Sequence, residues 1–177
     1  DRVDSDIVKT LHKGGIKLIV LRCAGFNNVA IETANEVGIP VLRVPAYSPE
    51  AVAEHAIALI LTLNRKTHKA YNRIREGNFS LEKLMGFNLH RHKVAVIGTG
   101  NIGKAFCRIL KGFGCLISAY DPYPSTELQE LGVKYGTLQE TLNDADIVAL
   151  HCPLTETTKH LINKETLKLF KEGAMLI

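Results

Sequence analysis

A glycine-rich segment between two regular patterns constrains the fold of this chain more than any other feature. Residues 98–103 read Gly-Thr-Gly-Asn-Ile-Gly, which is a GxGxxG pattern. The β-branched run at 94–97 precedes it directly, and a helical pattern at 101–113 begins inside it and is ended by Gly114. Such a strand–turn–helix passage is the start of a βαβ unit, so the sequence predicts a parallel sheet with right-handed helical crossovers.

The same alternation of strand and helix patterns continues through the chain. Beyond the glycine-rich segment we expect strands at 116–120, 134–135, 147–151 and 174–177 and helices at 127–131, 138–143 and 164–170. Before it we expect strands at 17–23 and 41–44 around a helix at 29–37, and then a long, strongly apolar helical pattern from 51 that turns polar at 65–75. The pattern predicts an α/β fold, with a domain crossing near Pro45–Ser48.

Each glycine of the motif has a predicted role in holding a phosphate group. Gly98 permits the tight turn, Gly100 lets a pyrophosphate approach the backbone, and Gly103 lets the helix pack on the strand. The free N–H groups at the helix start would then face the anion. The motif in this context therefore predicts a dinucleotide site in a Rossmann-type doubly wound sheet.

Asp121 stands where such a site needs an acid. It follows the second strand, 18 residues after Gly103. A carboxylate there accepts hydrogen bonds from the ribose 2′-OH and repels a 2′-phosphate, and residues 118–129 contain no Arg or Lys. The sequence therefore predicts NAD rather than NADP. Two alternatives stay open: a glycine-rich turn beside an ordinary surface Asp, and a methyltransferase-like site, against which the third glycine, Gly103, argues.

Composition and charge exclude several other classes. The 22 basic and 18 acidic residues give a net charge of +4, without a concentrated basic face for nucleic acid. No apolar run is long enough for a membrane span, and no export signal opens the chain, so we expect a cytoplasmic protein with reduced cysteines. His90 and His92 have no further ligands nearby, so we expect no metal.

Several longer segments resemble one family. They include Arg22 to Asn28, Val44 to His55, the motif with its preceding Val96 and Ile97, Asp121 to Pro124, and Leu150 to Thr155. This combination is similar to the D-2-hydroxyacid dehydrogenases, and within them to the bacterial fermentative D-lactate dehydrogenase branch. The resemblance implies that residues 1–46 are part of a flavodoxin-like catalytic domain and that 47–177 are most of the NAD-binding domain.

The resemblance also implies a reaction and a set of site residues. NADH would reduce the small-molecule substrate pyruvate to D-lactate, in a homodimer or larger oligomer. The backbone amides of Ala24 and Gly25 would hold the substrate carboxylate. The expected cofactor-binding residues are Tyr47, Gly98, Gly100, Asn101, Ile102, Gly103, Asp121, His151, Cys152, Pro153 and Thr158. The family's catalytic Arg, Glu and His would follow Ile177, so we expect these 177 residues alone to be inactive.

Some assignments remain open at this level. His151 ends a strand beside the point where strand order should reverse, so a cofactor-side role and a packing role are both consistent with the sequence. His55 is expected to be a packed helix residue rather than a catalytic base. A neighbouring specificity, such as hydroxyisocaproate or phosphoglycerate, and a non-catalytic NAD-binding relative of the corepressor type are the alternative functions.

Overall fold

The computed structural model describes residues 2–177, and these form two compact units that meet in the sequence after Ser48. Each unit has its own buried side chains. The first is centred on Val8, Val29, Ala34 and Ile39, and the second on a parallel sheet with helices on both faces. The units are therefore described separately.

The first unit contains two helices and a two-stranded parallel sheet. Its elements are α1 (Ser5–Lys13), β1 (Ile19–Leu21), α2 (Ile31–Glu36) and β2 (Val41–Arg43). β1 pairs with β2 in parallel, with Ile19 opposite Val41. The expected strand–helix–strand order is present, but α1 was not expected. Asp4 is its N-cap, because its side chain accepts a hydrogen bond from the Ile7 N–H at 3.1 Å.

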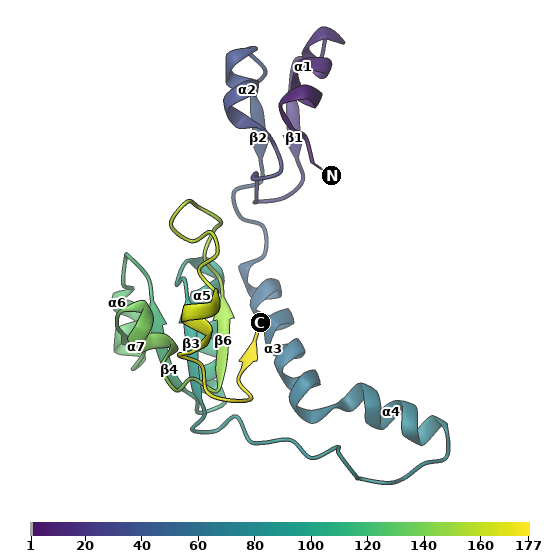
Figure 1. The fold of residues 1–177 in the computed structure, drawn as a ribbon, viewed down its shortest axis with the longest axis vertical. Coiled ribbons are helices and arrows are strands. Elements are labelled where there is room, and N and C mark those ends of the chain that lie inside the picture. Colours follow the sequence, from purple (N-terminus) through teal and green to yellow (C-terminus); the bar gives the residue numbers. More distant parts are fainter. Residues whose placement is uncertain (1) are drawn as a thin grey trace. The chain divides into compact units, whose positions relative to one another are not determined.

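The second unit is built on a five-stranded sheet in the order β5-β4-β3-β6-β7 (Figure 1). The strands are β3 (Lys93–Ile97), β4 (Leu116–Tyr120), β5 (Lys134–Tyr135), β6 (Ile147–Leu150) and β7 (Met175–Leu176), and every pairing is parallel. The chain runs from β3 outward to β5 and then returns to β6 on the other side of β3. This reversal is the switch point of a doubly wound sheet, and the predicted Rossmann-type fold is confirmed.

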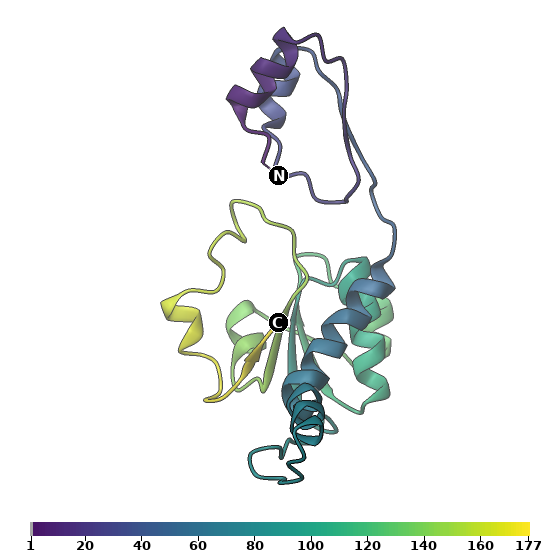
Figure 2. The same ribbon diagram turned by 90° about the vertical axis from the view of Figure 1, so that its right-hand side faces the viewer.

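Helices cover both faces of this sheet. The covering helices are α3 (Pro49–Arg65), α5 (Asn101–Gly112), α6 (Thr126–Glu130), α7 (Leu138–Leu142) and α8 (Lys164–Leu167). A further helix, α4 (Thr67–Arg75), follows α3 and has no buried residue. Val94 and Val96 of β3 pack in one core with residues of α3 and α5, whereas Ala95 and Ile97 pack in another with α7. Figure 2 shows α3 and α5 together on one side of the strands. The alternation along β3 explains why its apolar run is unbroken.

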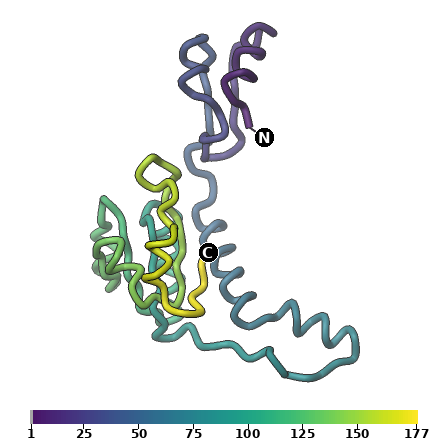
Figure 3. Tube along the Cα trace, in the orientation of Figure 1, coloured from purple at the N-terminus to yellow at the C-terminus, as the bar shows by residue number. Residues whose placement is uncertain are grey.

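The long apolar helix differs from the prediction at its C-terminal end. The chain turns at Lys66, which has a left-handed φ of 52°, so that α3 and α4 are separate helices. Figure 3 shows the turn and the extended run that leads back from α4 toward β3. Lys66 carries none of the glycine or asparagine chemistry that signals this conformation, which is why the sequence did not predict the break.

α3 is buried along one face only. Ala53, Ala56, Ile57 and Ile60 are inside, whereas Val52, Leu59 and Leu63 are exposed. The expectation of a packed His55 was wrong, because this residue is exposed. Among residues 2–177, no helix is both long enough and apolar enough to cross a membrane.

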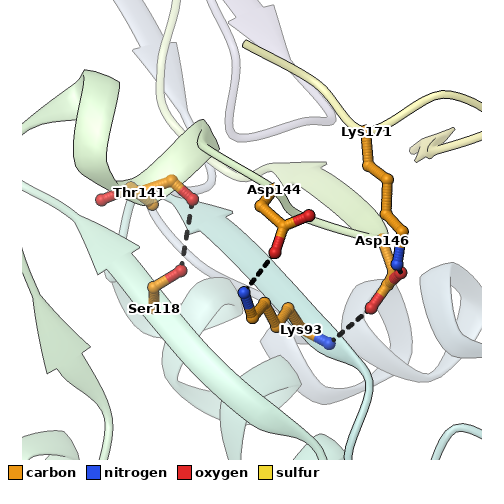
Figure 4. Close-up of polar contacts among 6 residues, drawn as sticks. All are labelled: Lys93, Ser118, Thr141, Asp144, Asp146 and Lys171. Carbon is orange, nitrogen blue, oxygen red and sulfur yellow. Dashed lines mark hydrogen bonds and ion pairs between the residues drawn. The ribbon is translucent and has the colours of Figure 1, made fainter.

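A polar cluster joins the amino ends of β3 and β6 (Figure 4). Asp146 accepts hydrogen bonds from the Lys93 N–H at 2.9 Å and from the Lys171 ammonium at 2.6 Å, and the Lys93 ammonium pairs with Asp144. Burial opposes ionisation of Asp146, but these hydrogen bonds outweigh it and lower the pKa of the carboxyl group. The cluster fixes the sheet at the edge opposite to the carboxyl ends of the strands.

Candidate functional site

A cleft of about 870 Å³ lies at the carboxyl ends of β3 and β6, in the second unit. Most of its lining comes from three segments: the glycine-rich loop, the residues that follow β4, and the residues that follow β6. Ligands of doubly wound sheets bind at this switch point. The lining includes Gly98, Thr99, Gly100, Asn101, Lys104, Asp121, Tyr123, His151, Cys152, Pro153, Thr158 and Lys159.

The glycine-rich loop leaves no room for side chains on its inner side. A Cβ on Gly103 would lie 2.1 Å from the Gly98 carbonyl oxygen, and one on Gly98 would lie 2.7 Å from the Cys152 nitrogen. Gly98 also has a φ of +93°. A Cβ on Gly100, in contrast, would meet nothing within 4 Å. The loop is therefore packed tightly against the rest of the protein at Gly98 and Gly103, and it has free space in front of Gly100.

Backbone amides without side-chain partners mark the open side of this loop. Gly100 is the N-cap of α5 and provides no side-chain hydrogen bond. The first N–H groups of a helix have no intrahelical acceptor, and they carry the positive end of the helix dipole. An open, amide-lined turn of this kind fits the pyrophosphate of a dinucleotide.

Asp121 is held firmly at the edge of the cleft. Its Oδ2 atom accepts hydrogen bonds from the Thr99 N–H at 2.6 Å and the Thr99 hydroxyl at 3.0 Å. Its Oδ1 atom accepts one from the Tyr123 N–H at 2.8 Å. The sequence predicted the position of Asp121 at this edge but not these contacts.

His151 lies below the glycine-rich loop and lines the cleft. Its ring packs on Phe106 of α5, with 4.6 Å between the ring centroids, and its Nε2 atom is buried without a hydrogen-bond partner. Burial lowers the pKa of His151 to about 4. The imidazole is therefore neutral at physiological pH.

The segment after β6 forms the far wall of the cleft. Thr158 donates a hydrogen bond from its hydroxyl to the Pro153 carbonyl at 2.6 Å, which closes the turn between them. Burial, more than the nearby Asp121 charge, raises the pKa of the Cys152 thiol. Cys152 therefore contributes a neutral thiol.

Two of the predicted cofactor-binding residues, both on α5, do not line the cleft. Gly103 is buried behind Gly98, and Ile102 is half-buried on α5. Neither is among the lining residues. Gly103 acts by allowing the helix to approach the loop, as its predicted packing role requires.

The remaining predicted residues belong to the first unit. The Arg43 guanidinium donates a hydrogen bond to the Ala24 carbonyl at 2.7 Å and lies 5.2 Å from the centre of the Phe26 ring. The Cys23 thiol donates to the Gly25 carbonyl at 3.2 Å. Tyr47 is 69% exposed. The roles predicted for Ala24, Gly25 and Tyr47 stay predictions.

Sequence reasoning missed four residues of the cleft region. Thr99 and Tyr135 contact each other and support Asp121, although they are 36 residues apart. Lys104 and Lys159 also line the cleft, and both lie outside residues 118–129, which surround Asp121 in the sequence. Within the part of the chain that the structure describes, no cluster of three or more His, Cys, Asp or Glu side chains is arranged to hold a metal ion.

Comparison with known proteins identifies the family. Residues 57–177 match the family described as D-isomer specific 2-hydroxyacid dehydrogenase, NAD binding domain. The chain belongs to the D-isomer-specific 2-hydroxyacid dehydrogenase family. The resemblance expected from the sequence is thereby confirmed, and so is NAD as the cofactor of this domain.

Several dehydrogenases of this family are similar over nearly the whole chain. D-lactate dehydrogenase of Escherichia coli is 52% identical over 171 residues, which are 97% of this chain and 52% of that protein. 2-Hydroxyacid dehydrogenase A of Aspergillus oryzae is 51% identical over 177 residues, 100% of this chain and 51% of that protein. The chain therefore spans about half the length of the curated relatives that it matches.

Solved structures of the family give the same result. The apo structure of the Escherichia coli D-lactate dehydrogenase matches with a TM-score of 0.89 and 51% identity, over 99% of this chain and 56% of that one. An Aquifex aeolicus D-lactate dehydrogenase, solved with NAD and lactic acid, matches with a TM-score of 0.89 and 36% identity, over 99% and 53%. The match to a family member with NAD bound agrees with the cleft's fit to a dinucleotide.

Proposed function

We propose that this protein is an NAD-dependent D-2-hydroxyacid dehydrogenase that reduces pyruvate to D-lactate. The observation that carries the proposal is the cleft at the switch point, where an amide-lined glycine loop and a fixed carboxylate lie side by side. The similarity to D-lactate dehydrogenases of more than one organism supports lactate as the product.

The proposed roles follow from the chemistry of the cleft. Gly98, Gly100, Asn101 and Ile102 would hold the pyrophosphate through the loop and the start of α5. Gly103 would keep α5 close enough to the strand for this. Bound NADH supplies the hydride for the keto carbon.

The other predicted residues complete the binding surfaces. Asp121 would bind the adenosine ribose, and His151, Cys152, Pro153 and Thr158 would shape the wall of the cleft against the cofactor. Tyr47 would lie near the nicotinamide, and the amides of Ala24 and Gly25 would hold the substrate carboxylate. Because His151 is neutral, it can donate a hydrogen bond but brings no charge to the site.

We propose a homodimer formed through the outer face of α3. Val52, Leu59 and Leu63 expose three large apolar side chains on this face, and such a patch on a helix marks an interaction surface. A cytoplasmic location remains a prediction. Sedimentation at micromolar concentration tests the dimer, and a monomer there would contradict it.

The test of the proposed function has two steps. Fluorescence titration of the purified protein with NADH and NADPH measures binding, and we expect saturable binding that is tighter for NADH. Oxidation of NADH is then measured with pyruvate and with a branched-chain keto acid, in a protein that carries this chain together with the family's catalytic Arg, Glu and His. The 177 residues alone are expected to bind NADH without oxidising it.

The outcomes separate the alternatives. Absence of NADH binding would overturn the proposal. Binding without turnover of any keto acid in the protein with the three catalytic residues would favour the non-catalytic relative. Faster turnover of the branched-chain acid would favour the hydroxyisocaproate specificity.

A further inference from the structure

We propose that Tyr135 is a positioning residue for cofactor recognition, which acts on Asp121 through Thr99. The proposal rests on the proposed function, since it assigns a discriminating role within the same cleft. Tyr135 itself is not among the residues that line the cleft. It belongs to β5, outside the glycine-rich motif and outside the segment around Asp121.

The side chains of Tyr135, Thr99 and Asp121 are linked by two successive hydrogen bonds, in which each hydroxyl donates to the next group. The Tyr135 hydroxyl donates to the Thr99 Oγ1 atom at 2.9 Å, and the Thr99 hydroxyl donates to the Asp121 Oδ2 atom at 3.0 Å. Each hydroxyl has a single proton to give, so the order of donors is fixed once the chain ends at a carboxylate that can only accept. Hydrogen bonds arranged in series polarise and strengthen one another.

The fold places Tyr135 where it can serve this purpose. β5 is only two residues long, and its register with β4 sets Tyr135 opposite Ala119, two positions before Asp121. The Tyr135 oxygen also accepts a hydrogen bond from the Ser125 N–H at 3.1 Å. One phenol oxygen therefore joins the glycine-rich loop to the end of the segment that carries Asp121.

Burial of these hydrogen bonds holds the three side chains in one arrangement. Thr99 is 3% exposed and Tyr135 is half-buried, so water cannot easily replace a lost partner. Without the Tyr135 hydroxyl, the Thr99 hydroxyl would be free to turn away from Asp121. The Thr99 N–H would then be the only donor left on Oδ2.

The same hydrogen bonds also determine how many acceptor sites of the Asp121 carboxylate remain free for a ligand. A carboxylate has about four lone-pair sites. Thr99 uses two on Oδ2 and Tyr123 uses one on Oδ1, so the remaining acceptor site is on Oδ1. A ribose hydroxyl can donate to such a site, whereas a 2′-phosphate brings only acceptors and a like charge. The fixed carboxylate thus favours NADH over NADPH, and Tyr135 helps to fix it.

The test compares NADH and NADPH binding in variants of the purified protein. Tyr135→Phe removes one hydroxyl and should weaken NADH binding about threefold to tenfold, with a much smaller change for NADPH. Thr99→Val removes the hydroxyl that links Tyr135 to Asp121 and should weaken NADH binding at least as much as Tyr135→Phe does. Thr99→Ser keeps the hydroxyl and should bind NADH nearly as the original protein does. Tyr71→Phe, on the exposed face of α4, is the matched control for loss of a tyrosine hydroxyl.

The ratio of the two dissociation constants is the deciding readout. A lowered NADH preference in Tyr135→Phe and Thr99→Val, restored in Thr99→Ser, would support the proposal. An unchanged ratio in variants whose thermal unfolding shows them to be folded would overturn it, and so would an equal loss for both cofactors. Should Tyr135→Phe fail to fold, the Thr99→Val and Thr99→Ser pair decides alone. No NADH binding by the original protein would overturn the proposed function, and this inference with it.

Discussion

The two loops proposed to bind anionic groups are held in place by different kinds of contact. The loop at Gly98–Gly103 is closed by backbone contacts, with Thr99 buried and His151 packed beneath it. The loop at Ala24 and Gly25 is held by the exposed Arg43 side chain and has open space around Gly25. Both would offer backbone amides to a ligand. The first is fixed by packing, and the second by a contact that water can compete with.

This difference predicts where substitutions are tolerated. In a close-packed region an added methyl group must displace backbone, whereas in an open loop it displaces water. Four predictions follow from the contrast, in order of decreasing effect.

Gly103→Ala should destabilise the second unit most. The new Cβ would lie 2.1 Å from the Gly98 carbonyl oxygen, so the helix and the loop must separate, at a cost of roughly 3 kcal/mol. Urea unfolding followed by circular dichroism measures the loss. Gly25→Ala is the matched control and should change stability by less than about 0.5 kcal/mol. Equal effects of the two would refute the contrast between the loops.

His151 should make stability depend on pH between about 6.5 and 4. Burial lowers the pKa of His151 from 6.5 to about 4 in the folded protein, so in this range the unfolded chain binds the extra proton and the folded chain does not. The stabilisation that depends on a neutral His151 is therefore fully present above pH 6.5 and is lost as the pH falls toward 4, by roughly 3 kcal/mol.

Substitution of this histidine tests the pH effect. His151→Gln should flatten the curve of unfolding free energy against pH in that window, whereas His55→Gln, at an exposed position of α3, should leave its slope unchanged. Urea unfolding at several pH values between 4 and 7 gives both curves. A slope that persists in His151→Gln would show that other groups cause it.

Gly100→Ala should separate binding from stability. A Cβ at this position meets no atom of the protein within 4 Å, so folding should be unaffected. The same methyl group would occupy the approach of the pyrophosphate, and NADH binding should weaken by about tenfold or more. Calorimetric titration and thermal unfolding of one sample give both values. Undiminished NADH binding would place the pyrophosphate elsewhere.

Arg43→Ala should have the smallest effect, and only on substrate. Steady-state kinetics are measured in the protein that carries this chain together with the family's catalytic Arg, Glu and His. Loss of the hydrogen bond to Ala24 and of the contact with Phe26 should raise its KM for pyruvate about threefold to fivefold, with little change in kcat or in NADH affinity. Arg22→Ala removes an exposed arginine of the same segment and is the control. A fall in kcat with an unchanged KM would assign Arg43 a different role.

Local signals made the glycine-rich half of the cleft predictable. The turn, the helix start and Asp121 all follow from residue types at fixed spacing, and Gly98, Gly77 and Gly114 have the positive φ values expected of turns and helix ends. α1 was missed although Asp4 is a good N-cap, because the helix is short and its apolar face narrow. The sequence holds no comparable signal for the bend at Lys66.

Contacts between distant segments could not be predicted from single residues. Tyr135 reads as an ordinary strand residue, and only the register of β5 against β4 brings its hydroxyl to Thr99. The neutrality of His151 likewise depends on Phe106 and the covering loop, since a strand-end histidine exposed to water would titrate near its usual pKa. Sequence periodicity locates such residues but does not give their partners.

The hydrogen bonds on Asp121 have a kinetic consequence. The carboxylate is already oriented by Thr99 and Tyr123 before any cofactor arrives, so little reorganisation accompanies the encounter. Association of NADH and NADPH should then proceed at similar rates, and the choice between them should be made by how long each stays.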